Sequence, residues 1–230
     1  MQKIKTIFHF FFDLIFPKNC VGCDVFADTL CAKCREEIKV IETFVCPKCG
    51  KINDSGKYCL ECRSDLALFG LLISADYRHG PTKEMIHHFK YSGATEFASV
   101  LADLMMGRVS QLKNHQKMIL VPVPLYFWRQ RDRGYNQSEI LARIVGKKLG
   151  LKIINPLKRK KTKPQVGLSG RARRKNLEGA FKMRKFANVL DKTIILVDDV
   201  STTGTTLEEC AKVLHSAGVK RVWGLVIARG

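Results

Sequence analysis

One stretch of this chain, residues 197–206, combines acidic, hydroxyl and glycine residues in the order V-D-D-V-S-T-T-G-T-T. A short apolar run before the acids predicts a strand buried on both faces of a parallel sheet, with Asp198 and Asp199 at its end. A turn of hydroxyl residues around Gly204 follows. Apolar residues then recur at helical spacing over 207–217, so the turn is predicted to lie at the amino end of a helix.

These residue types, so placed, can bind a phosphate. Unpaired backbone N–H groups and the dipole at a helix amino end favour an anion, and a glycine lets the backbone fold closely around it. Open parallel sheets bind ligands beyond the carboxyl ends of their strands, where the acids lie. A threonine-capped helix is the alternative, although capping accounts for one hydroxyl only. The candidate phosphate-binding residues are Ser201, Thr202, Thr203, Gly204, Thr205 and Thr206.

Eight of the nine cysteines form four C-x-x-C pairs. This spacing lets a turn present two thiolates to a tetrahedral Zn²⁺, and two turns complete a site. We expect two structural Cys₄ zinc sites, with the first four cysteines on one ion and the last four on the other; cross-braced pairing is the alternative. Disulfides are a further alternative, but the missing export signal argues against them. An iron–sulfur cluster could also use four cysteines, but the regular pairs are more typical of zinc ribbons. The expected ligands are Cys20, Cys23, Cys31, Cys34, Cys46, Cys49, Cys59 and Cys62.

The elements that position these residues follow an α/β pattern. From Phe69 onward, strand and helix patterns alternate, which predicts a mostly parallel sheet. Cys210 lies on the apolar face of the helix after the turn, so we expect a buried core residue rather than a nucleophile. The expected strands cover 71–77 and 119–124, and the expected helices cover 82–90, 95–109 and a segment after Gln137.

Two cationic segments accompany this pattern. Arg131 and Arg133 lie between a strand and a helix start, where guanidinium groups match phosphate oxygens; an exposed basic loop is the alternative. Residues 158–185 hold twelve Lys or Arg against one acid. With few apolar residues, the segment 158–181 is expected to be a mobile loop or lid. The whole chain has a net charge of +19, which indicates an anionic partner.

The amino-terminal segment does not suit a membrane span. Its apolar run, 7–16, is ten residues long and contains Asp13, whereas crossing a bilayer needs about 20 residues. We expect no transmembrane segment and an amphipathic helix over 1–17 that packs on the main domain, with membrane contact as the alternative. Reduced thiols and the missing signal predict a cytoplasmic protein, with a peripheral place at the inner face of the membrane as the alternative.

The acid-and-hydroxyl stretch resembles the phosphoribosyl-pyrophosphate (PRPP) signature of type I phosphoribosyltransferases. Four further motifs occur with it in one order over nearly the whole chain: four C-x-x-C pairs, V-P-V-P, R-x-R-G-Y-N-Q and Q-x-x-L-S-x-x-x-R-x-x-N. Together they resemble the ComF family, double zinc ribbon amidophosphoribosyltransferase-like proteins tied to DNA uptake in competent bacteria. The resemblance implies a type I phosphoribosyltransferase fold over 67–230 behind a double zinc ribbon over 18–66.

The resemblance also implies ligands and residue roles. PRPP would bind with Mg²⁺. Its 5-phosphate would lie in the hydroxyl turn and its ribose hydroxyls at Asp198 and Asp199, which would be the catalytic residues. Arg131 and Arg133 would contact the pyrophosphate, and basic residues of the loop would close over it. We place Arg171 and Arg174 in that closing role, and Lys90 and Tyr91 at the border of the acceptor pocket.

Two functions stay open at this point. The chain could be a phosphoribosyltransferase that transfers or senses the phosphoribosyl group. It could instead be a non-catalytic protein that binds single-stranded DNA for the uptake machinery, with a PRPP-responsive or vestigial site. Cations beside the aromatic residues Tyr126, Phe127 and Trp128 suit single-strand binding, although these rings can equally pack between strand and loop. The acceptor nucleophile and the partner proteins are not identified by the sequence.

Overall fold

The computed structural model of this chain describes residues 19–26, 29–91, 95–126, 134–160, 170–185 and 187–230. For four of these residues it describes the backbone alone: Gly170, Arg171, Arg173 and Arg174. The helix expected over 1–17 and the expected phosphate ligands Arg131 and Arg133 lie outside the described residues. Within the described ranges, no helix has the length and apolar character needed to cross a membrane.

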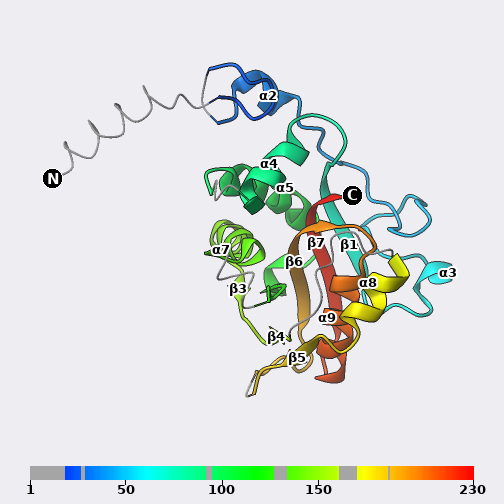
Figure 1. The fold of residues 1–230 in the computed structure, drawn as a ribbon. Helices are drawn as coiled ribbons and strands as arrows, with labels where there is room; N and C mark the ends of the chain where they lie inside the picture. The colour runs from blue at the N-terminus through cyan, green and yellow to red at the C-terminus, as the bar shows by residue number, and fades with distance from the viewer. Residues whose placement is uncertain (1–18, 27–28, 92–94, 127–133, 161–169, 186) are drawn as a thin grey trace.

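A five-stranded sheet forms the centre of the molecule, and all neighbouring strands run parallel (Figure 1). The order across the sheet is β1-β7-β6-β2-β3. This sheet confirms the predicted α/β fold class. The strands are β1 (Gly70–Asp76), β2 (Ile119–Pro122), β3 (Lys152–Ile153), β6 (Thr193–Ser201) and β7 (Arg221–Arg229).

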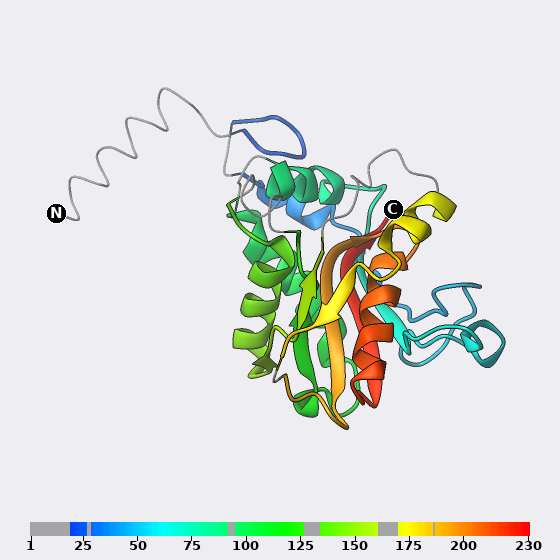
Figure 2. The same cartoon turned by 60° about the horizontal axis from the view of Figure 1, so that its bottom comes forward.

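Helices cover both faces of the sheet (Figure 2). Side chains alternate between the two faces along a strand, so in β6 Ile195 packs in one core layer and Ile194 in the other. The first layer contains α4, α5 and α7, and the second contains α9. The helices are α4 (Thr82–Tyr91), α5 (Phe97–Ser110), η1 (His115–Lys117), α7 (Gln137–Leu149) and α9 (Thr205–Ser216).

Strand β6 extends farther than the sequence predicts. The apolar run suggests an end at the two acids, but pairing with β7 continues to Ser201 opposite Arg229. The extension occurs because β7 is apolar along nearly its whole length and pairs with residues of β6 on both sides of Asp199. Asp198 and Asp199 therefore project from within a strand, and both contact side chains from the helical layer of α4 and α7.

The basic segment also differs from the prediction of a loop. Its described parts form a short antiparallel hairpin and a helix. Three buried side chains, Leu157, Leu177 and Phe181, pack in the core layer of α9 and hold these elements in place. They are spaced too widely among charged residues to give a periodic signal. The elements are β4 (Leu157–Arg159), α8 (Gly170–Leu177) and β5 (Phe181–Met183).

The cysteine-rich region packs beside β1 and α5. It contains two short helices, α2 (Ala32–Glu36) and α3 (Leu60–Arg63). Single bridges join Val40 to Ala75 and Lys57 to Gly70. Arg108 of α5 donates a 2.8 Å hydrogen bond to the carbonyl of Glu42. The region is therefore attached to the edge of the sheet.

Candidate functional site

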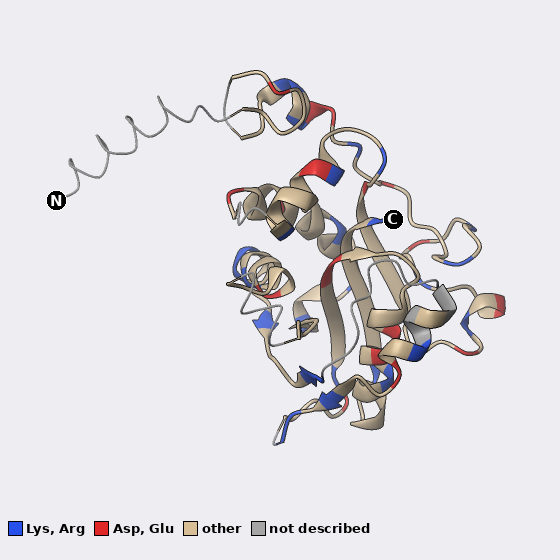
Figure 3. Cartoon of the chain, viewed as in Figure 1, with Lys and Arg blue, Asp and Glu red and all other residues tan. Residues whose placement is uncertain are grey.

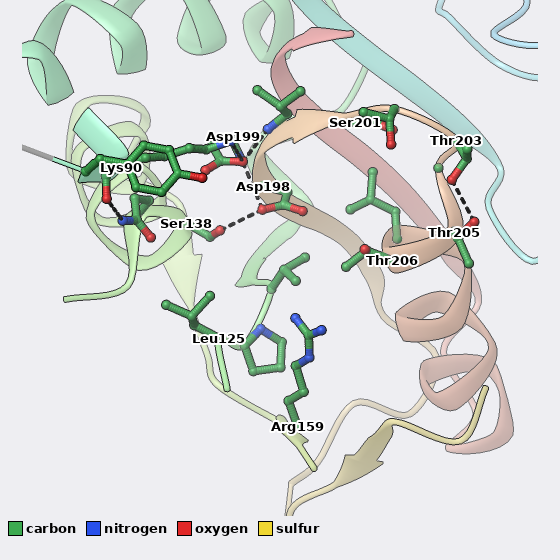
Figure 4. A pocket seen from close by; sticks show the side chains of 18 residues that line it. Lys90, Leu125, Ser138, Arg159, Asp198, Asp199, Ser201, Thr203, Thr205 and Thr206 are labelled. Carbon is green, nitrogen blue, oxygen red and sulfur yellow. Dashed lines mark hydrogen bonds and ion pairs between the residues drawn. The ribbon is translucent and has the colours of Figure 1, made fainter. Parts of the chain in front are cut away.

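A cavity of about 240 Å³ opens at the carboxyl ends of β2 and β6 (Figure 4). This is the edge where parallel sheets bind ligands. One side of the cavity is the stretch from Asp198 to Leu207, which includes the whole hydroxyl turn. The other side comes from three distant elements: the end of α4, the start of α7 and strand β4. The fold thus brings the predicted acids and the predicted phosphate turn into one pocket.

Each acid is held through one of its two carboxylate oxygens. Asp198 Oδ1 accepts hydrogen bonds from Ser138 Oγ at 2.9 Å and from the backbone N–H of Asp199 at 2.9 Å. Asp199 Oδ1 lies 3.1 Å from Lys90 Nζ and accepts a 2.6 Å bond from the N–H of Val200. All of these contacts, made within the described part of the chain, use Oδ1. The Oδ2 atoms therefore keep their capacity to accept hydrogen bonds from a ligand.

The pKa of Asp198 is raised to about 7. Burial is the largest cause, and the charge of neighbouring Asp199 raises the pKa further. The hydrogen bond from Ser138 and the charge of Lys90 act in the opposite direction. Two adjacent carboxylates in one partly buried site resist full ionisation. Asp198 can consequently change protonation near neutral pH.

The hydroxyl turn has the geometry of an anion site. Gly204 has a φ of 76° and precedes the first residue of α9, and such a positive φ strains any residue with a Cβ. Thr203 Oγ1 and Thr205 Oγ1 lie 2.8 Å apart. Ser201 Oγ is buried and forms no hydrogen bond with the described residues. An orphaned buried hydroxyl beside the first turn of a twelve-residue helix fits a ligand oxygen.

The motif residues Tyr135, Asn136 and Gln137 connect α4 with α7. The anion-binding prediction for this region rests on Arg131 and Arg133, which lie outside the described residues. In the structure the Tyr135 hydroxyl donates a hydrogen bond to the carbonyl of Phe89, and Gln137 Nε2 donates a 3.5 Å hydrogen bond to the carbonyl of Lys90. Asn136 Oδ1 caps α7 by accepting from the N–H of Ser138 at 3.1 Å. These three side chains fasten the end of α4 and the start of α7 around the pocket.

The described residues test none of the four expected cation contacts. Arg171 and Arg174 lie in α8, but their side chains are outside the description, and Arg131 and Arg133 are outside it altogether. Arg159, which the sequence does not single out, lines the pocket from β4 (Figure 4). The alternation Leu157, Lys158, Arg159 in a half-buried strand is the signal that could have found it.

The eight paired cysteines form two compact groups. Cys20, Cys23, Cys31 and Cys34 make one, and Cys46, Cys49, Cys59 and Cys62 make the other; within each group the sulfur atoms lie within 4.8 Å of one another. The Sγ atoms of Cys23 and Cys31 are 3.8 Å apart, and those of Cys49 and Cys59 are 3.7 Å apart. Tetrahedral Zn²⁺ with bonds of about 2.3 Å separates its sulfurs by about 3.8 Å. The residues fit two Cys₄ zinc-binding sites with sequential pairing, and the cross-braced alternative is wrong.

The first cysteine of each group is prepared to bind metal. Burial raises the pKa of Cys20, but backbone N–H groups, foremost that of Cys31, outweigh burial and lower the pKa to about 6. The same arrangement lowers the pKa of Cys46 to about 6. A thiolate is the form that zinc binds. Cys210, by contrast, is fully buried in the core and its pKa is raised well above the usual value by burial, as expected for an inert thiol.

Similarity to known families accounts for both regions of the chain. Residues 11–63 match the double zinc ribbon domain, and residues 93–229 match the phosphoribosyl transferase domain. Competence protein F of Haemophilus influenzae is 33% identical over 222 residues, which are 86% of this chain and 96% of that protein. The chain belongs to the ComF family.

Other proteins resemble this ComF-family chain more distantly. DNA utilization protein YhgH of Escherichia coli is 31% identical over 206 residues, or 85% of this chain and 89% of that protein. A solved hypoxanthine phosphoribosyltransferase from Staphylococcus aureus is 14% identical, with a TM-score of 0.37 over 58% of this chain and 64% of its own. That last likeness concerns the fold alone.

The sequence does not predict the part that three residues play in the pocket of this ComF-family chain. Ser138 and Arg159 are not predicted at all, and Lys90 is predicted only at the border of an acceptor pocket. They come from α7, β4 and α4, and no local pattern shows that these elements converge on the acids. The sequence identifies the turn, and the fold supplies the residues that face it.

Proposed function

We propose that this chain binds Mg²⁺–PRPP in the pocket and transfers or senses its phosphoribosyl group. The observation that carries the proposal is the placement of two acids beside a hydroxyl turn at the amino end of α9. The turn would hold the 5-phosphate through backbone N–H groups and the orphaned Ser201 hydroxyl. The acids would accept hydrogen bonds from the ribose hydroxyls through Oδ2. The match to the phosphoribosyl transferase domain supports this assignment.

The donor set of the pocket suits an ion that accompanies PRPP. Mg²⁺ prefers carboxylate, hydroxyl and phosphate oxygens, and the pocket offers the first two kinds. Bound to the pyrophosphate, Mg²⁺ would neutralise part of the negative charge that develops there. Arg131, Arg133, Arg171 and Arg174 remain the proposed contacts of the pyrophosphate.

The chemistry asks the protein mainly for position and charge. A nucleophile would form a bond to the anomeric carbon as the bond to pyrophosphate breaks, and positive charge would develop on the ribose ring. Asp198 and Asp199, held through Oδ1, would fix the ribose and stabilise that charge. Arg159 would add a cation on the opposite side of the pocket. The identity of the nucleophile decides whether the site transfers the group or only binds PRPP.

Calorimetric titration of Mg²⁺–PRPP into the zinc-loaded protein tests this function, with Ser201→Ala as a probe of the turn. Wild type should bind saturably in the micromolar range, and Ser201→Ala should weaken binding about tenfold without loss of thermal stability, because its hydroxyl has no protein partner. Ser216→Ala, on the exposed end of α9, is the matched control and should change nothing. Absence of binding by wild type would contradict the proposal.

A second candidate function is binding of single-stranded DNA, with the uptake machinery as partner. The hairpin β4–β5 favours it: Lys158 stands directly opposite Lys182 across the two strands, and Lys182 is close enough to lower the pKa of Lys160. Like charges directly opposite each other destabilise a hairpin. A bound polyanion would relieve the repulsion between these lysines. Figure 3 shows basic residues, coloured blue, on both strands of the hairpin. The name of the Escherichia coli relative refers to DNA utilization.

Salt dependence of oligonucleotide binding tests the second candidate. Neutralising the lysines of 158–163 should reduce the slope of log affinity against log salt by about one for each lysine that contacts a phosphate. Lys83→Gln and Lys113→Gln, both exposed and outside the hairpin, are the control variants. An unchanged slope in the hairpin variant would show that this segment does not touch DNA.

A further inference from the structure

Lys90 forms the ion pair that links the acids to the helical layer. Its Nζ lies 3.1 Å from Asp199 Oδ1, and the two side chains are 20% and 13% exposed. Figure 4 shows Lys90 reaching into the pocket from the end of α4 beside Asp199, while Ser138 approaches Asp198 from α7. The two acids are therefore held by side chains from two different helices.

The backbone that carries Lys90 is itself fixed. Tyr135 donates to the carbonyl of Phe89, and Gln137 donates to the carbonyl of Lys90. Phe89 is fully buried in the core. The last turn of α4 is thus anchored by the buried side chain of Phe89 and by the hydrogen bonds to its two carbonyl groups. A lysine on so constrained a turn has a defined position, in contrast to a lysine on a flexible surface.

The charge of Lys90 balances the pocket. Among the described lining residues, the acids Asp198 and Asp199 face two cations, Lys90 and Arg159. Loss of Lys90 would remove one of these two cations and make the charge of the pocket more negative by one unit. PRPP carries several negative charges, so this change would disfavour its binding. Partly buried charges are screened little by solvent, which makes the imbalance significant.

We propose that Lys90 is a positioning residue for the acid pair: it holds Asp199 by Oδ1, presents Oδ2 to a ribose hydroxyl and offsets the negative charge of the acids. This role deepens the proposed function and rests on it. Lys90 precedes the segment 93–229 that matches the phosphoribosyl transferase domain. Lys90, in α4, therefore contributes to the pocket from outside the matched segment.

A thermal double-mutant cycle tests the ion pair without any ligand. In the zinc-loaded protein, Lys90→Met should lower the unfolding midpoint by about 2–6 °C, because Asp199 loses its partner. In an Asp199→Asn background the same substitution should lower it by less than about 1 °C. Equal effects in both backgrounds would overturn the proposal, whatever the pocket binds.

Ligand binding tests the consequence for the site. Lys90→Met should weaken Mg²⁺–PRPP binding about tenfold or more, and Lys90→Arg, which keeps the charge, should restore affinity to within about threefold of wild type. Lys83→Met, an exposed lysine of the same helix, is the matched control and should bind as wild type does. A purely structural role would give no rescue by arginine.

The outcomes separate the two proposals. Unchanged or tighter binding by Lys90→Met, with wild type binding normally, would show that Lys90 does not position the acids for PRPP. Failure of wild type to bind Mg²⁺–PRPP would contradict the proposed function and the ligand role of Lys90 together. The thermal cycle would in that case still decide whether Lys90 and Asp199 are coupled.

Discussion

The pocket has two walls that the chain builds in different ways. The turn wall, residues 198–207, is one continuous stretch in which each residue is near its neighbours in sequence. The assembled wall includes Lys90, Ser138 and Arg159, from α4, α7 and β4. Ser138 lies 60 positions from the acid that it contacts. In the proposed function the turn wall carries the groups that meet the ligand, whereas the assembled wall orients those groups and balances their charge.

The difference shows which substitutions should remove binding and which should only weaken it. A change in the turn wall deletes a group that contacts PRPP in the proposed function. A change in the assembled wall leaves these groups present but less well placed. Loss of the paired acids should accordingly reduce affinity more than any single change in the assembled wall.

The largest effect is expected from Asp198→Asn combined with Asp199→Asn. Loss of both charges should weaken Mg²⁺–PRPP binding on the order of 1,000-fold or more in calorimetry. Affinity for single-stranded DNA should stay the same or rise, because two negative charges are removed. Asp191→Asn, an exposed acid before β6, is the control. Equal loss of both affinities would contradict two separate binding roles.

The raised pKa of Asp198 predicts a pH dependence of stability. This pKa is about 7 in the folded protein and about 3.9 in an unfolded chain. Between these values the folded state holds a proton that the unfolded state has lost, so the free energy of unfolding falls as pH rises from about 4 to about 7. Asp198→Asn cannot ionise and should gain stability relative to wild type over that interval, by at most about 4 kcal/mol.

Urea unfolding between pH 4.5 and 8 measures this gain. The difference between variant and wild type should be small at the acid end and level off above pH 7. Asp191→Asn, whose carboxylate is exposed, should show no comparable trend. A difference between Asp198→Asn and wild type that does not depend on pH would contradict the burial of a titrating Asp198.

A smaller effect is expected from Gly204→Ala in the turn wall. An added Cβ would meet only Ser201 Oγ at 3.9 Å, so space is available, and the cost comes from the φ of 76°. We expect about 1 kcal/mol of lost stability and about fivefold weaker Mg²⁺–PRPP binding, measured by thermal unfolding and calorimetry. Gly107→Ala, within α5 and also in open space, should instead be stabilising. Similar results for both glycines would show that conformation at Gly204 is unimportant.

The smallest effect is expected from Tyr135→Phe, which tests the support of the assembled wall, because Tyr135 fastens the end of α4 that carries Lys90. It removes one hydrogen bond to the carbonyl of Phe89 and leaves the ring in place, so about 1 kcal/mol of stability should be lost. Mg²⁺–PRPP affinity should fall no more than about threefold. Tyr58→Phe, remote from the pocket, serves as the comparison. A loss as large as that from the paired acid substitutions would remove the distinction between the two walls.

Much of the site was open to prediction because it is local. Four C-x-x-C pairs predicted the two zinc groups, and the acid-and-hydroxyl stretch predicted a turn at the start of a helix. Phosphate binding by that turn stays a prediction. The domain boundaries and the contacts of Arg131, Arg133, Arg171 and Arg174 stay predictions. The order found within 158–181 was not predicted, because Leu157, Leu177 and Phe181 are too sparse to form a pattern until α9 brings them together.

The sequence by itself determined the hydroxyl turn, the helix start and the paired thiolates, because each of these is set by neighbours only a few positions apart. The tertiary structure alone decided which oxygen of each acid stays available. That choice depends on Lys90 and Ser138, which approach from separate helices. It also depends on β7, whose long pairing carries β6 through the acids to Ser201. Such contacts arise when distant segments bury their apolar faces on one sheet, and no local pattern encodes them.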